Sequence, residues 1–458
     1  MYGGDKMTTK LSKKTWLNIV LFGLMGQIAW SVENMYFNTF LFNKIGGTTD
    51  DINKMVAASA AVAVLTTFVM GAFSDRLGKR KPFICFGYIL WGVTVMAFAF
   101  ISRENTAKIL HLTDSAQVVA VTVSIVVIMD CLMTFMGSTC NDAAFNAWVT
   151  DTTDTTNRGT VESVNAMLPI AAALLVTVGF GAGATALGYG PCFIGLGLLV
   201  VFCGLLGLVT LKETKTLRHS DGNYLQNLIY GFRPSVIKEN RRLYVIFTAQ
   251  CISAIAMQVI MPYLFIYLQH YLGFDFNSAI GQLTAKPLLL AVAGVVVVAV
   301  VVAVIGFGKL TDKKGKDIFL IPAVALQIVG FALAFPMKHI LSFAAAIAVY
   351  GLGALTLGII LSAAVRDNTP TDRVGAFQGV RMIFNVLLPM VIGPKIGTEV
   401  ISHFSKYHTL GTYLNDYGET VASPVPEIFA FAAGVSLFLL IPAIIMKKKG
   451  YIKPEKAK

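Results

Sequence analysis

Long apolar runs alternate with short charged clusters along the whole of this sequence. Many of the runs reach the ~20 residues that an α-helix needs to cross the ~30 Å of hydrocarbon in a membrane. Only 14% of the 458 residues are charged, whereas soluble domains carry about 25%. The sequence therefore predicts an all-α protein that crosses a membrane many times.

Twelve spans fit the hydropathy pattern. The first run is too long for the apolar region of a signal peptide, and no small-residue cleavage site follows it, so we expect it to be retained as a span. The predicted spans are residues 16–42, 54–74, 83–102, 116–147, 161–187, 190–211, 243–269, 283–308, 317–336, 339–364, 374–398 and 427–446.

The clusters of basic residues all fall in connections on one side of the predicted membrane. They occur in the N-terminal tail, after the second, sixth and eighth spans, and after the last span. Because cytoplasmic loops are enriched in Lys and Arg, we expect both termini on the cytoplasmic side of the cell membrane. The net charge of +12 therefore reflects topology, and it does not indicate nucleic-acid binding.

The polar connection 212–242 separates two predicted halves of six spans, 1–211 and 243–458. The segment 399–426 lies on the predicted outer side and contains several Gly and Pro residues, so we expect it to be a loop. The six cysteines all fall in apolar runs and lack metal-ligand spacing, so they are expected to be small buried hydrophobic residues.

One short motif occurs twice. "GAFSDRLGK" fills Gly71–Lys79, and "GKLTDKKGK" fills Gly308–Lys316, about half the chain further on. Each copy closes the second span of its half, and internal duplication of this kind is common in transporters. The first glycine lets helices approach closely, and the second permits a tight turn. The aspartate, Asp75 or Asp312, can face a helix N-terminus or the following basic residues. The alternative is a basic loop that repeats by chance.

This repeat resembles the signature of the major facilitator superfamily, which lies between helices 2 and 3 and recurs between helices 8 and 9. Further segments are similar to its glycoside–pentoside–hexuronide:cation symporters, and most of all to the sucrose/proton branch. They are "GKRKPFI", "GQIAWSVENMYFNTFLFNKIG", "NDAAFNAWVTDTTDTTNRG" and "VRDNTPTDRVGAFQGV".

The resemblance implies twelve transmembrane helices in two pseudo-symmetric six-helix halves. It also implies a set of residues for conformational gating: Gly71, Asp75, Arg76, Gly78, Asp151, Arg158, Asp312, Gly315, Asp367 and Arg373. The sequence departs from the sodium-coupled melibiose branch, because its second span, "AVAVLTTFVMG", lacks that branch's pair of acids. A proton is therefore the expected coupling ion, and sodium is less favoured.

Few ionisable residues lie within the predicted spans. The candidate functional acids among them are Glu33, Asp130 and Asp142. A charged side chain in the centre of the bilayer costs at least ~2.5–3.5 kcal/mol, so it usually serves a function or has a partner. A buried carboxylate can also hold and release a proton near neutrality. Glu33 is therefore a candidate for proton coupling, for sugar binding, or for a structural pair with Arg381. The resemblance supports Asp142 in cation or sugar binding, whereas Asp130 fits coupling and structural hydrogen bonding equally well.

Other polar and aromatic residues within the spans are suited to bind a sugar. Amides and carboxylates hydrogen-bond to sugar hydroxyls, and aromatic rings stack on the apolar faces of sugar rings. The predicted substrate-binding residues are Trp30, Glu33, Asn34, Phe37, Asn38, Asn146, Gln250, Gln258, Tyr263, Arg381 and Asn385.

The sequence contains no phosphate-binding loop of the Walker type and no nucleophile–base signature. We therefore expect a transporter, not an enzyme, without metal or cofactor and driven by a proton gradient. The expected activity is symport of a sugar or glycoside by a monomer that rocks its halves about a central site. The alternatives are a carrier of lysolipids, amphiphiles or another small solute, and a non-transporting sensor or membrane enzyme on the same scaffold.

The predicted topology can be tested by labelling single cysteines in a chain that lacks its native ones. A cysteine at Ser220 or Lys448 is expected to react with a membrane-impermeant maleimide only from the cytoplasmic side. A cysteine at Tyr413 is expected to react only from outside, because an odd number of predicted spans separates it from Ser220. Labelling at Ser220 from outside would show that the span count is wrong.

Overall fold

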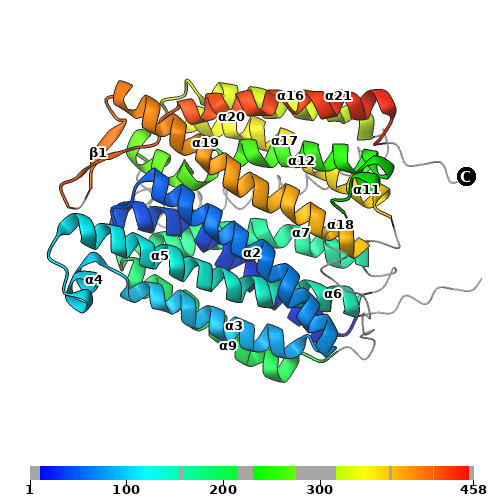
Figure 1. Cartoon of the computed structure of the whole chain (residues 1–458), viewed down its shortest axis with the longest axis horizontal. Coiled ribbons are helices and arrows are strands. Elements are labelled where there is room, and N and C mark those ends of the chain that lie inside the picture. Colours follow the sequence, from blue (N-terminus) through cyan, green and yellow to red (C-terminus); the bar gives the residue numbers. More distant parts are fainter. Residues whose placement is uncertain are drawn as a thin grey trace, which may run out of the picture. The chain divides into compact units, whose positions relative to one another are not determined.

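The computed structural model describes residues 11–153, 158–213, 231–274, 316–370, 374–415 and 417–452, and it is almost entirely helical (Figure 1). The predicted eighth span, 283–308, lies outside these residues, as do Asp312, Gly315 and Arg373. The α-helices are α1 (Lys13–Val32), α2 (Thr49–Leu77), α3 (Lys81–Ala97), α4 (Arg103–Leu110), α5 (Ser115–Gly137), α6 (Asn146–Thr152), α7 (Arg158–Leu175), α8 (Gly181–Ala186), α9 (Tyr189–Thr210), α11 (Pro234–Glu239), α12 (Arg241–Gln258), α13 (Leu264–Ile266), α16 (Lys316–Ala334), α17 (Ile340–Asn368), α18 (Val374–Met382), α19 (Leu388–Phe404), α20 (Glu427–Leu437) and α21 (Leu440–Lys449).

Several long helices contain π-helical segments, in which the backbone is wound more widely than in an α-helix. The π-helical segments are η1 (Glu33–Phe37), η2 (Phe40–Lys44), η4 (Ser138–Phe145), η5 (Val176–Phe180), η7 (Tyr267–Tyr271) and η8 (Ile383–Leu387). Short 3₁₀ turns occur at η3 (Phe98–Phe100), η6 (Met261–Tyr263) and η9 (Ser405–Tyr407).

Within the described residues, 11 helices are long and apolar enough to cross a membrane. Each of them overlaps one of the predicted spans, and the remaining prediction is the eighth span named above. This agreement confirms the all-α membrane architecture. The six cysteines are free, and four of them are buried, whereas Cys131 and Cys192 are partly exposed.

The chain forms two compact units. The first contains Met1–Gly47 and Ala61–Gly222, and the second contains Thr48–Ala60 and Asn223–Lys458. The helix α2 therefore begins in the second unit and ends in the first. The predicted boundaries at 211 and 243 stay a prediction.

Aromatic residues form a dense cluster in the first unit. The ring of Phe37 lies 4.2 Å from that of Phe98 and 5.4 Å from that of Phe193. Phe40 and Tyr189 extend the cluster around Phe193. Because aromatic rings supply much buried area at low cost in conformational entropy, this cluster holds the first helix against α3 and α9.

The helices α3 and α9 pack closely along their length (Figure 1). Glycines make this approach possible. A Cβ added to Gly197 would lie 2.5 Å from the carbonyl oxygen of Gly92, and one added to Gly204 would lie 2.7 Å from that of Cys85. Since these neighbours are backbone atoms, they cannot move aside. Small residues therefore set the distance between the two helices, as is usual between membrane helices.

The second unit has one apolar core to which α12, α16, α17, α18 and α21 contribute. Its largest members include Phe247, Phe377 and Met446, which are almost fully buried. In Figure 1 the pair α16 and α21 lies side by side, in agreement with the contacts between these helices.

The segment 399–426 differs from the predicted loop. The helix α19 continues to Phe404, and a two-stranded antiparallel hairpin follows, formed by β1 (Thr412–Leu414) and β2 (Thr420–Ala422). Tyr413 pairs with Val421 in this hairpin. The prediction was wrong because strands of three residues are too short to show a period in the hydropathy.

The close approach of α3 and α9 can be tested with two substitutions on α9, one at the contact and one away from it. Gly197→Val should lower the thermal unfolding midpoint, because overpacking costs about 1–3 kcal/mol when neighbours cannot move. Gly195→Val should cost much less, because a Cβ at Gly195 meets no atom within 4 Å. The midpoint can be followed in detergent by tryptophan fluorescence. Equal shifts for the two variants would contradict the close approach of these helices.

Candidate functional site

Glu33 is the first residue of η1, inside the long first helix. It is only 8% exposed. Thr134 of α5 donates a hydrogen bond from Oγ1 to Glu33 Oε1 over 3.1 Å. The other carboxylate oxygen, Oε2, is buried and has no hydrogen-bond partner in the described part of the chain. Because buried polar atoms nearly always have a partner, this oxygen is suited to bind a proton or a donor group of a solute.

A polar stripe runs along α5 and η4 opposite Glu33. Asp130, Thr134, Ser138 and Asp142 follow one another at intervals of four residues, which brings them to one helix face. Ser138 Oγ donates a hydrogen bond to Asp142 Oδ2 over 3.0 Å. Glu33 interacts electrostatically with both Asp130 and Asp142. The structure thus places Glu33 against the helix that carries Asp130 and Asp142, through its contact with Thr134.

Two tryptophans lie close to this stripe. The rings of Trp30 and Trp91 are 5.1 Å apart. Both contact α5 at Gly137, where a Cβ would lie 2.8 Å from Trp91 and 3.0 Å from Trp30. The missing side chain of Gly137 therefore allows the two indoles to reach the helix that carries the acids.

A chain of hydrogen bonds fixes the turn of η4 that contains Asn141 and Asp142. Asn141 Nδ2 donates to the hydroxyl of Tyr88 over 2.7 Å, and this hydroxyl donates to the carbonyl oxygen of Phe22 over 2.7 Å. Asn141 is the residue before Asp142. The chain therefore connects the first helix, α3 and η4, and it positions the backbone beside the carboxylate.

The predicted amides of the first unit donate hydrogen bonds to their own helices. Asn34 donates to the carbonyl oxygen of Trp30, Asn38 to that of Asn34, and Asn146 to that of Asp142. Asn34 and Asn146 are exposed, whereas Asn38 is buried. Phe37 is buried in the aromatic cluster described above.

The predicted residues of the second unit lie on α12, η6, α18 and η8. Asn385 Nδ2 donates to Gln250 Oε1 over 3.2 Å. Gln258 packs against Gly393 of α19. The hydroxyl of Tyr263 donates to the carbonyl oxygen of Pro394 over 2.8 Å. Arg381 of α18 is exposed.

Candidate residues of both units lie in π-helical segments. Glu33 belongs to η1, Asp142 to η4 and Asn385 to η8. A π-helical turn leaves some backbone groups less tightly paired and often occurs at functional sites. This feature connects residues that no motif in the sequence had linked.

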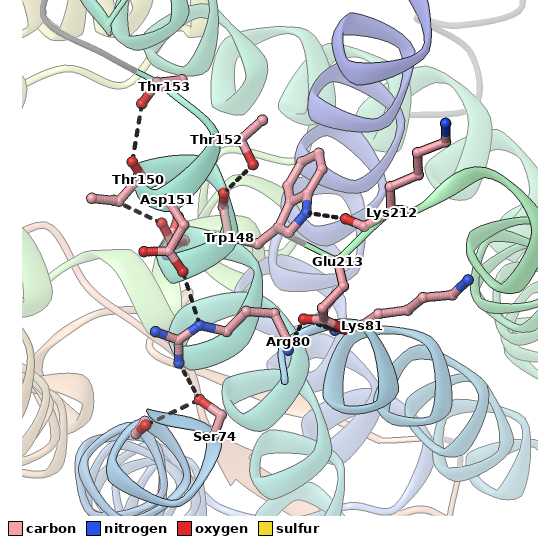
Figure 2. A network of polar contacts seen from close by, with 12 residues as sticks. Ser74, Arg80, Lys81, Trp148, Thr150, Asp151, Thr152, Thr153, Lys212 and Glu213 are labelled. Carbon is pink, nitrogen blue, oxygen red and sulfur yellow. Dashed lines mark hydrogen bonds and ion pairs between the residues drawn. The ribbon is translucent and has the colours of Figure 1, made fainter. Parts of the chain in front are cut away.

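A second polar cluster lies at the end of the first unit that the sequence predicts to be cytoplasmic (Figure 2). Arg80, which is only 5% exposed, forms an ion pair with Asp151, with 3.1 Å between Nε and Oδ2. It also donates a hydrogen bond from Nη1 to Ser74 Oγ. The guanidinium therefore connects α6 with the end of α2.

Glu213 completes this cluster from the residues that follow α9. Its carboxylate accepts hydrogen bonds from the backbone N–H groups of Arg80 and Lys81, at the start of α3. A carboxylate at a helix N-terminus satisfies otherwise unpaired donors and interacts favourably with the helix dipole. Trp148 adds a hydrogen bond from Nε1 to the carbonyl oxygen of Lys212 over 3.1 Å. Together with the contacts of Arg80, these hydrogen bonds connect the ends of four helices, α2, α3, α6 and α9.

The predicted gating residues are only partly found in this cluster. Gly71 accepts the hydrogen bond of Ser74 Oγ at its carbonyl oxygen. Gly78 has a φ of 60°, the left-handed conformation that favours glycine in a turn. Arg76 and Asp367 are exposed. Asp75 and Arg158 lie in helices whose backbone alone is described at these positions, and the other gating residues were named above as outside the described ranges.

Several residues of these two clusters were not predicted from the sequence. Thr134 and Ser138 could have been found from the spacing between Asp130 and Asp142, which they divide into steps of four. Arg80 stands among several basic residues, and nothing in the sequence distinguishes it from Arg76.

The family model described as "Major Facilitator Superfamily" matches residues 16–394 of the chain. No curated protein sequence matches the chain significantly.

Solved transporter structures have a similar fold. A bacterial homolog of the human lysosomal transporter Spinster, in an inward-facing and unoccupied conformation, aligns with a TM-score of 0.64 and 13% identity over 98% of this chain and 100% of its own. A variant of the nucleoside transporter NupG aligns with a TM-score of 0.65 and 12% identity over 94% of this chain and 99% of its own. At this level of identity, the likeness concerns the fold.

The ion pair of Arg80 can be tested against its exposed neighbour. Arg80→Gln should destabilise the protein by about 1–2 kcal/mol, because it leaves Asp151 without its partner, although partial exposure of Asp151 reduces the cost. Arg76→Gln should have almost no effect. Arg80→Lys should recover only part of the loss, because an ammonium lacks the planar fork that reaches two partners. Thermal unfolding in detergent measures all three. A shift for Arg76→Gln as large as that for Arg80→Gln would contradict the assignment.

Proposed function

Since this chain belongs to the major facilitator superfamily, we propose that it is a secondary active transporter for a sugar or glycoside, coupled to proton symport. Its two halves would expose a central site to each side of the membrane in turn. We place the protein in the cell membrane as a monomer with both termini in the cytoplasm. The proton gradient is its energy source, and the melibiose-type acids that would favour sodium are missing from the second span.

The observation that carries the proposal is the cluster of Glu33, Asp130 and Asp142. A carboxylate that is buried within a membrane span is costly to ionise, and Glu33 and Asp130 are only 8% and 1% exposed, so these acids are suited to carry a proton. Thr134 orients one oxygen of Glu33 and leaves the other without a partner in the described residues. Glu33 is therefore our first choice for the coupling acid, and Asp142 is the second.

Side chains in each of the two units suit a polar solute with a ring. Trp30, which is partly exposed, offers an aromatic face one turn before Glu33, and faces of this kind stack on sugar rings, whereas Trp91 is fully buried and supports the indole of Trp30. Gln250 and Asn385, which are hydrogen-bonded to each other, provide amide groups in the second unit. We assign substrate contacts to these residues and to the other predicted binding residues of both units.

A nucleoside is the second candidate for the cargo. The partly exposed indole of Trp30 favours it, because a nucleobase also stacks on aromatic rings. One of the similar structures is that of a nucleoside transporter. A lysolipid or another amphiphile is less favoured, because the acids and amides of the cluster would face its alkyl chain.

Conformational gating is assigned to the cytoplasmic cluster and the repeated turn. Arg80, Asp151 and Glu213 tie helix ends together in the first unit, so their contacts stabilise one arrangement of these ends. Asp75 and Asp312, with the neighbouring glycines, are proposed to act in the same way in the two copies of the motif.

The proton-coupling role of Glu33 can be tested with purified protein in proteoliposomes. Glu33→Gln keeps the shape of the protonated acid but cannot release a proton. Counterflow of a labelled cargo should therefore survive, whereas accumulation driven by a pH gradient should fall to the level of empty vesicles. A panel of labelled disaccharides, glycosides and uridine identifies the cargo first. Asp142→Asn is the comparison, and Glu399→Gln is the control, because Glu399 is 64% exposed and pairs with Lys395.

The outcome of this experiment shows which of the two acids, Glu33 or Asp142, carries the coupled proton. If Glu33→Gln still concentrates the cargo and Asp142→Asn does not, the coupling acid is Asp142, and Glu33 binds solute or stabilises the fold. If both variants concentrate the cargo as the wild type does, proton coupling through this cluster is wrong. If the wild-type protein shows counterflow of no compound in the panel, the proposed cargo is wrong, although the transporter fold is unaffected.

A further inference from the structure

The described residues between α19 and α20, 405–415 and 417–426, form a cap at the end of α19. We call these residues the hairpin cap. The N–H of Gly411 donates to the carbonyl oxygen of His408 over 3.0 Å, and the N–H of Ser423 donates to that of Gly411 over 2.8 Å. A Cβ at Gly411 would collide with the backbone of Ser405. The cap is therefore folded back on the end of α19 and held there by its own backbone.

His408 fixes the cap to two other helices. Its Nε2 lies 2.8 Å from Oε1 of Glu427, at the start of α20. Its Nδ1 lies 3.2 Å from the hydroxyl of Tyr271, at the end of η7. Both ring nitrogens thus have partners, and these contacts fix the orientation of the imidazole.

A cavity of about 300 Å³ opens beside this imidazole. It is lined by Tyr271, Lys338, Tyr407, His408, Thr409 and Leu410. Lys338 belongs to the connection between α16 and α17, so the lining combines three separate parts of the second unit. The lining contains one lysine and no carboxylate, and Glu427, which lies outside the lining, is hydrogen-bonded to His408.

The backbone adds donors to this cavity. Thr409 and Leu410 are the central residues of the turn that the hydrogen bond from Gly411 to His408 closes. Their N–H groups donate no hydrogen bond to any residue in the described part of the chain. Adjacent free N–H groups beside a lysine form a favourable environment for a carboxylate or phosphate oxygen.

We propose that this cavity binds a small soluble molecule that carries one carboxylate or phosphate group. Lys338 and the turn at Thr409 hold the anionic group. The hydroxyls and ring faces of Tyr271 and Tyr407 contact the rest of the molecule. A volume of about 300 Å³ is at the lower end of the range for small-molecule sites, which suits a solute of the size of a sugar acid. The site requires no assumption about the transported cargo.

The proposal can be tested by calorimetric titration of the full-length protein in a neutral detergent. Glucuronate and glucose 6-phosphate are the anionic probes, and glucose is the neutral one. At least one anion should bind, and glucose should bind at least tenfold more weakly. Binding of glucose as tight as that of the anions, or no binding of either anion, would overturn the proposal.

Four variants test whether the anion binds in this cavity. Lys338→Gln should weaken it about tenfold, whereas Lys406→Gln should leave it unchanged, because Lys406 is exposed and does not line the cavity. Thr409→Pro should weaken it severalfold by removing one N–H. Proline fits there because His408, with φ −112° and ψ 136°, already has the extended conformation that precedes proline. Thr409→Ala keeps the N–H and should bind within twofold of the wild type.

Two outcomes with the variants and with lipid would count against the site. Equal affinity of Lys338→Gln and wild type would place the anion elsewhere. Addition of phosphatidylglycerol to the micelles distinguishes a lipid headgroup from a soluble anion. If this lipid abolishes binding of the sugar anion at low molar ratio, the cavity belongs to a lipid, and the proposal of a soluble ligand is wrong.

Discussion

The interior of a membrane provides no water to hydrogen-bond with, so the polar groups of this chain depend on partners within the protein. The helices satisfy the backbone, and many side chains follow the same rule. Asn34 and Asn38 donate to carbonyl oxygens of their own helix, and Tyr263 donates to that of Pro394. Glu33 Oε2 is one of a small set of buried side-chain atoms in the described residues that lack a hydrogen-bond partner. A carboxylate oxygen of this kind is suited to bind a proton or a donor group of a solute.

Close packing of the helices determines where such a group can lie. Glycines bring α3 against α9, and Gly137 lets two indoles reach α5. The polar stripe from Asp130 to Asp142 is then enclosed by aromatic rings and by the first helix. Enclosure strengthens electrostatic interactions, because there is little water to screen them. The site therefore depends on small residues that bind no solute themselves.

The candidate site in the first unit is only partly visible in the sequence. The acids stood out because a charge within an apolar run is rare, and Thr134 follows from their spacing. Arg80 does not, because Arg76, Lys79, Arg80 and Lys81 have the same local composition. The turn at Gly78 buries the third of these four residues and leaves Arg76 exposed. Burial of one cation among several is a result of backbone direction, which hydropathy does not encode.

The sequence by itself determined the architecture of this protein, because hydropathy, charge bias and an internal repeat are local properties that add up along the chain. The spans, the expected family and the rare acids all follow from them. Only the tertiary structure decided that Glu33 meets Thr134, which is 101 positions away, and that Arg80 pairs with Asp151. It also decided that the described residues between α19 and α20 form the hairpin cap. Such contacts depend on how helices approach one another in space, and that approach is set by many side chains acting together.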